Sequence, residues 1–136
     1  MIQDGGSAER DNSRWAIDIA WLEERGRAFP AMAEHCLCTK CRKRRKSEAE
    51  PAATDALFGA AKECSAHSGD YITGGLPILE SIFRLFLAEG NKPLDLTELG
   101  RRLSERRGVD TYRTSVEMLS RLLRNDRHYG IRRVEA

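Results

Sequence analysis

Two short segments with cysteines constrain the fold of this chain more than any other feature of its 136 residues. The first is Cys38-Thr-Lys-Cys41 and the second is Cys64-Ser-Ala-His67, so each carries two metal-binding side chains separated by two residues. Zinc prefers four soft or borderline ligands arranged as a tetrahedron. We therefore predict one structural zinc ion, Zn²⁺, bound by Cys38, Cys41, Cys64 and His67, with no position left open for chemistry.

The surrounding residues leave other ligand sets and other chemistry open. Cys36 or His35 could replace one of the four ligands, although the C-x-x-C spacing gives the better turn and we predict that Cys36 is not a ligand. A redox dithiol would be expected in a βαβ setting, which the flanking pattern lacks. Ordinary free thiols are the third alternative. In a reducing compartment, clustered cysteines more often bind metal than form disulfides.

The first half of the chain contains weak helical patterns around these segments. Residues 1–12 are polar and are expected to be disordered. A helix is predicted over residues 14–27, because Trp15, Ile19 and Leu22 recur at helical spacing. The stretch after the basic run 42–46 is typical of an exposed linker. A second short helix, over residues 55–63, would deliver Cys64.

The second half has clearer helix signals. Pro77 suits a first helical turn and Gly90 suits a position just after a helix end. Asp95 with Glu98 resembles a capping box, and Thr114 with Glu117 repeats the pattern. Residues 127–134 have a turn-like centre and a β-branched end, which predicts a short strand or hairpin.

Three helices followed by a β-like tail is the order of winged-helix modules, and residues 76–136 resemble this class. The segment Lys92-Pro-Leu-Asp-Leu-Thr-Glu-Leu-Gly-Arg-Arg-Leu is similar to the start of the second helix in the HARE-HTH group. That group includes the amino-terminal domain of the bacterial RNA polymerase delta subunit. The resemblance covers less than half of the chain and implies a transcription-related contact with nucleic acid or with RNA polymerase.

The expected fold is therefore mainly α with a small β-wing. A helix and a zinc-binding knot would occupy residues 13–75, and a winged-helix-like domain of three helices would occupy residues 76–136. In winged-helix modules the third helix can enter the DNA major groove, and the hairpin after it can touch phosphate or the minor groove.

The charge pattern permits an anionic partner. The formal net charge of +2 is far from that of a histone-like protein, but residues 40–46 are all basic except Cys41. Arginine can contact phosphate or read guanine, and lysine adds attraction to phosphate. The predicted nucleic-acid-binding residues are Lys43, Arg44, Arg45, Arg113, Ser115, Arg121, Arg124, Arg127, Arg132 and Arg133. The alternative is a plain charged surface, because Glu98, Glu105, Glu117 and Asp126 are interspersed with them.

These patterns favour a zinc-stabilised DNA-binding protein that regulates transcription or associates with RNA polymerase. The alternative is a protein–protein adaptor with the same structural zinc, which would present exposed side chains such as Trp21, Phe29 or Tyr112. A homodimer paired through the amino-terminal helix fits either function.

We expect no enzymatic activity and no membrane partner. Gly74-Gly75 lacks the Lys-Ser/Thr of a phosphate-binding loop, and the signature of zinc deaminases is missing. No stretch approaches the ~20 apolar residues that span a bilayer. The first residues lack the pattern of a secretory signal. We therefore expect a cytoplasmic protein.

Overall fold

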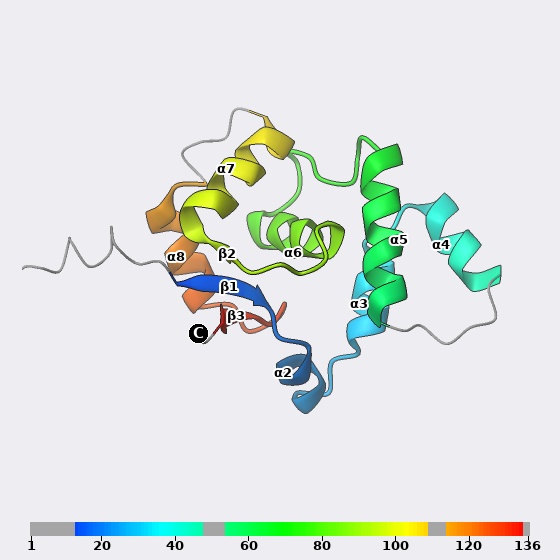
Figure 1. Cartoon of the computed structure of the whole chain (residues 1–136), viewed down its shortest axis with the longest axis horizontal. Helices are drawn as coiled ribbons and strands as arrows, with labels where there is room; N and C mark the ends of the chain where they lie inside the picture. Colours follow the sequence, from blue (N-terminus) through cyan, green and yellow to red (C-terminus); the bar gives the residue numbers. More distant parts are fainter. Residues whose placement is uncertain (1–12, 48–53, 109–113, 135–136) are drawn as a thin grey trace, which may run out of the picture.

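The structure is a computed structural model that describes residues 13–47, 54–108 and 114–134. It is mainly helical, with a small three-stranded antiparallel sheet, as the sequence predicts (Figure 1). The elements in chain order are β1 (Arg14–Ile17), α2 (Ile19–Glu24), α3 (Phe29–His35), α4 (Thr39–Ser47), α5 (Thr54–His67), α6 (Ile78–Ala88), β2 (Leu94–Asp95), α7 (Leu96–Arg107), α8 (Val116–Arg124) and β3 (Ile131–Val134).

The sheet joins the two ends of the chain, with β1 in the centre between β2 and β3. The predicted helix over residues 14–27 is wrong in its first part, because residues 14–17 form a strand. Ile17 pairs with Ile131, more than a hundred residues along the chain, and such a non-local partner leaves no signal in local helical spacing. The helix starts after Asp18, whose side chain accepts a hydrogen bond from the Trp21 amide.

Asn91 fixes the end of β1 against the loop that follows α6. The Ile17 amide donates to the Asn91 side-chain oxygen at 2.8 Å, and the Asn91 side-chain nitrogen donates to the Ile17 carbonyl at 2.9 Å. Asn91 has a φ of 61°, a conformation that asparagine tolerates better than most residues. The Asn91 side chain therefore takes the place of a neighbouring strand for the backbone amide and carbonyl of Ile17.

Helix α6 is the centre of the hydrophobic core. Its residues Ile82, Phe83, Leu85, Phe86 and Leu87 are all fully buried. The core is one continuous cluster that includes side chains from β1, α3, α5 and α8. The core therefore extends across residue 76, where the sequence predicts the start of the winged-helix-like domain.

The second half runs as α6, β2, α7, α8 and β3. The capping prediction at Asp95 is confirmed, since its carboxylate accepts from the Glu98 amide at 2.8 Å. The second cap lies one residue later than predicted: Ser115, not Thr114, accepts from the Met118 amide. The Thr114 hydroxyl is 2.7 Å from the Ser104 hydroxyl. The predicted strand near the end is present as β3, and its partner is β1.

Helices α4 and α8 lie near opposite ends of the molecule's longest axis (Figure 1). Helix α4 packs beside α5 at one end, and α8 lies beside α7 and the sheet at the other. The basic segment 40–46 and the arginines of α8 therefore belong to two separate surfaces.

Candidate metal centre and candidate nucleic-acid interface

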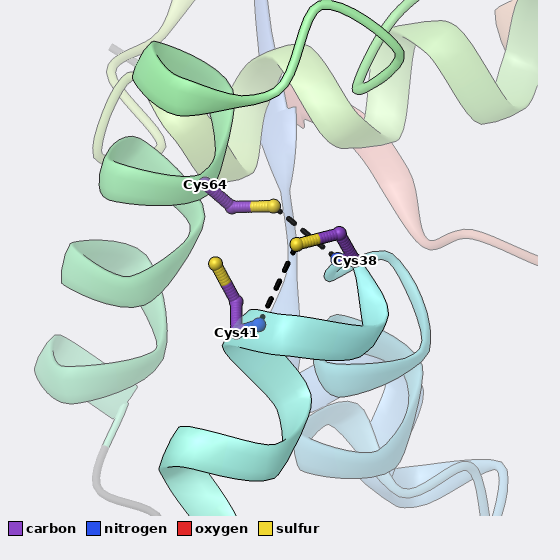
Figure 2. Close-up of side chains that lie close together, drawn as sticks. All are labelled: Cys38, Cys41 and Cys64. Atoms are coloured by element: carbon purple, nitrogen blue, oxygen red, sulfur yellow. Dashed lines mark hydrogen bonds between the residues drawn. The ribbon is translucent and has the colours of Figure 1, made fainter.

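Three of the four predicted metal ligands come together in the structure. The Sγ atoms of Cys38, Cys41 and Cys64 lie within 4.8 Å of one another. Figure 2 shows the three sulfur atoms pointing toward one another, two from the start of α4 and one from α5. Three thiolates bound to one tetrahedral zinc ion lie about 3.8 Å apart, because each Zn–S bond is about 2.3 Å. The cluster can therefore hold a metal ion with little movement of its side chains.

The C-x-x-C segment adopts this position because it forms the start of a helix. Helix α3 ends at His35, and Leu37 anchors the following turn in the core with only 3% of its surface exposed. Cys38 then takes the place of a capping residue, since its Sγ accepts from the Cys41 amide at 3.4 Å (Figure 2). Donors at a helix start favour an anion.

Cys64 reaches the same point from the buried face of α5. Leu57, Ala61 and Cys64 follow at helical spacing, and each is at most 1% exposed. The Cys38 amide donates to the Cys64 Sγ at 3.3 Å, which ties the turn to α5 (Figure 2). The predicted short helix is longer than expected, and so it carries both Cys64 and His67.

The thiols differ in acidity because their surroundings differ. The backbone amide of Cys41 lowers the pKa of Cys38 to about 7. Burial raises the pKa of Cys41 to about 12, with a further contribution from Cys38. Cys38 is therefore the thiol that most readily carries negative charge, and a metal ion would have to displace the proton of Cys41.

His67 does not belong to the cluster as the side chains stand. Within the described residues, no fourth histidine, cysteine or acidic side chain shares the mutual spacing of the three sulfur atoms. His67 is exposed on the last turn of α5 and lines a cavity of about 440 Å³ together with Cys38 and Cys41. Its role as the fourth ligand therefore stays a prediction.

Cys36 lies apart from the three clustered thiols. It is buried, its thiol donates to the Met32 carbonyl at 3.5 Å, and burial raises its pKa to about 11. It lines a different cavity together with His35 and His128.

The predicted nucleic-acid-binding residues divide into two groups. Lys43, Arg44 and Arg45 lie in α4, and Arg44 pairs with Glu63 at 3.2 Å. The others that are described lie in or near α8 and β3: Ser115, Arg121, Arg124, Arg127, Arg132 and Arg133. Arg113 lies outside the described residues.

The arginines of α8 and β3 contrast with those of α7. On α7, Arg101 pairs with Glu98 and Glu105, and Arg102 pairs with Glu89 and Glu98. No described carboxylate pairs with any of the five arginines between residues 121 and 133. Asp126, which lies among them in sequence, is buried and accepts from three backbone amides.

Two tryptophans pack against the arginines of β3, and no sequence pattern predicts these contacts. The Arg132 guanidinium lies 4.9 Å from the centre of the Trp21 ring, and that of Arg25 lies 4.2 Å from it. Arg133 lies 5.6 Å from the Trp15 ring. Ring faces attract guanidinium groups, so these contacts orient positive charge along the strand.

Comparisons with protein-family models, with curated proteins and with solved structures gave no match for this chain. Within the described residues, no helix is both long and apolar enough to cross a membrane.

Proposed function

We propose that the chain is a cytoplasmic DNA-binding protein of transcription whose amino-terminal half is held by a structural zinc ion. Cys38, Cys41 and Cys64 bind the ion, and His67 completes the site. The observation that carries the DNA-binding proposal is the row of arginines on α8 and β3 without described carboxylate partners.

The surface chemistry of α8 supports this choice. Leu119 and Leu123 are buried against the core, while Arg121 and Arg124 are exposed on the opposite side. A helix with unneutralised arginines on its outer face attracts phosphate and can reach base edges in a major groove. By contrast, the carboxylates on α7 cancel much of the charge of its arginines.

The order of elements in the second half also supports it. Helix α8 is the third helix after residue 76, and β3 follows it where the resemblance predicts a wing. In this proposal α8 lies in the groove, and Arg127, Arg132 and Arg133 contact the phosphate backbone beside it. Contact with RNA polymerase rests on the resemblance alone.

The experiment that tests DNA binding compares two arginines of α8 with one arginine of α7. Wild-type protein should shift a random-sequence duplex in a salt-dependent manner. The Arg121→Gln/Arg124→Gln variant should bind about tenfold more weakly, because two phosphate or base contacts are lost. The matched control is Arg101→Gln, which changes an arginine that is already paired with Glu98 and Glu105 and should bind like the wild type.

Equal losses in both variants, or no shift at low salt, would contradict the proposal. A protein that fails to bind duplex DNA but co-purifies with a partner would support the adaptor alternative. Phe29 cannot serve that adaptor as predicted, because it is only 1% exposed. Trp21 is partly buried and has arginines close to its ring, and Tyr112 lies outside the described residues.

The zinc proposal has its own pair of variants. Protein purified without added metal should contain about one zinc per chain. Cys64→Ser should lose the metal and lower the melting temperature, because it removes a fully buried ligand. Cys36→Ser changes a buried cysteine outside the cluster and should keep the metal. Metal retained in the Cys64→Ser protein would exclude this ligand set.

A further inference from the structure

The metal centre is open on one side. A cavity of about 440 Å³ lies against the cluster and is lined by Cys38, Lys40, Cys41, Arg44, His67 and Ser68. Cys64 is fully buried and is not part of its wall. A tetrahedral ion bound to the three sulfur atoms would have one further position. The cavity lies beside two of the three cysteines, Cys38 and Cys41.

The side chain of His67, the predicted fourth ligand, is not fixed by its surroundings. It lies one helical turn after Cys64 and is exposed, and its side chain forms no hydrogen bond or ion pair with any described residue. Metal-bound histidines are normally oriented by a hydrogen bond from the second ring nitrogen. Without such a partner, the imidazole is the weakest of the four predicted ligands.

The cavity wall favours a negatively charged occupant. Lys40 is exposed and no described carboxylate pairs with it. Arg44 pairs with Glu63, but both side chains are more than half exposed, and such a surface pair is weak. A divalent ion with three thiolates would have a net charge of −1, so an anionic fourth ligand needs nearby positive charge, and Lys40 supplies it.

We propose that His67 is a displaceable ligand and that the cavity admits a small anionic thiol, whose sulfur takes the fourth position on the metal. The incoming thiol loses its proton to solvent, a metal–sulfur bond forms, and the metal–nitrogen bond to His67 breaks. No oxidant or reductant is needed. Soft thiolates suit an ion that is already held by three cysteines. The inference rests on the proposed metal site.

Cobalt(II) makes the exchange visible, because thiolate ligands give it an intense charge-transfer absorption. The full-length chain is loaded with Co²⁺ and titrated with mercaptoacetate, an anionic thiol. Absorbance should rise by about one third, since three thiolates become four. Glycolate has the same charge without the sulfur and should leave the spectrum unchanged. Cysteamine has the sulfur with a positive charge and should bind about tenfold more weakly.

Variants separate the roles of the cavity residues. His67→Ala should bind mercaptoacetate about tenfold more tightly, because the competing imidazole is gone. Lys40→Gln should bind it several-fold more weakly. The control His35→Ala removes another exposed histidine, which lines a different cavity, and should match the wild type.

Three results would overturn the inference: an unchanged spectrum with mercaptoacetate while Co²⁺ stays bound, removal of Co²⁺ from the protein on gel filtration, or equal affinity in His67→Ala and wild type. If the protein shows no thiolate absorption with Co²⁺ at all, the proposed metal site itself is contradicted. Failure of DNA binding alone leaves the exchange at the metal unaffected.

Discussion

The Asp126 carboxylate shapes the turn between α8 and β3. It is 2% exposed, and its two oxygens accept from the amides of His128, Tyr129 and Ile131 at 2.9 to 3.0 Å. Asp126→Ala should reduce the free energy of unfolding by about 3 kcal/mol, because buried amides lose a charged acceptor. Denaturant unfolding measures this. Asp126→Asn keeps one acceptor oxygen and should lose less; equal stability of all three proteins would show that the turn forms without the carboxylate.

Glu98 gives the fold a measurable dependence on pH. Hydrogen bonds from Arg101 and Arg102 lower its pKa from 4.5 to about 2. A carboxyl group whose pKa is lower in the folded state than in the unfolded state stabilises the protein when the pH is above the unfolded-state pKa. This contribution is lost as the pH falls toward the folded-state pKa. Glu98→Gln should therefore melt below wild type at neutral pH. The difference should shrink below pH 4.5 and vanish near about pH 2. Melting curves across this range test it, and a constant difference would contradict it.

The candidate metal ligands illustrate which residues of a site can be predicted from a sequence. The C-x-x-C spacing is local, because Cys38 caps the helix that carries Cys41. Cys64 is predictable as a ligand because it begins a second pair of metal-binding residues, Cys64 and His67. The position of His67 depends on its side-chain conformation at an exposed helix end, which spacing does not determine. Cys36 and Cys38 are only two residues apart, but they line different cavities, and no spacing rule predicts this difference.

At the scale of elements, the approach of α7 to the turn before α8 depends on a glycine. A Cβ atom at Gly100 would lie 2.4 Å from the Thr114 carbonyl oxygen. Gly100→Ala should therefore reduce the stability by about 1–3 kcal/mol, as overpacking does, and weaken DNA binding by displacing α8. Gly59→Ala is the matched control, since nothing lies within 4 Å of its Cβ position in α5. It should gain up to about 1 kcal/mol. Equal effects of the two substitutions would contradict the close packing.

The elements that the sequence does not predict depend on distant strand partners or on a helix cap. Trp15 and Leu22 share a helical spacing, but residues 14–17 gain a place between two strands from the far end of the chain. The sequence predicts only a tight turn and a basic run around Cys41, and the structure has helix α4 there as far as Ser47. The linker predicted after this run lies mostly in residues 48–53, outside the described residues. Helices α6, α7 and α8 are predictable, because their buried faces follow the helical period and α7 and α8 also have local side-chain caps.

At the scale of the molecule, the two halves of the chain are joined by more than the proposed metal ion. β1 and the continuous core already join the first half of the chain to the second. Among the α4 side chains that the structure describes, only Cys41 is buried. Chelation should therefore speed amide hydrogen exchange mainly in α4 and in the turn before it, and leave β1 and α6 protected. Uniform loss of protection would instead mean that the metal supports the whole fold.

The two basic surfaces at opposite ends of the molecule lead to the last prediction. Each neutralised phosphate contributes about 0.9 to the slope of log K against log salt. On a duplex long enough for one protein, Arg121→Gln/Arg124→Gln should lower that slope by about two. Lys43→Gln/Arg44→Gln should leave it unchanged, since α4 and α8 lie near opposite ends of the longest axis and the proposed duplex lies at α8 (Figure 1). Equal reductions in both variants would mean that the duplex runs along the molecule or bends around it, and that the basic helix beside the metal centre is part of the same interface.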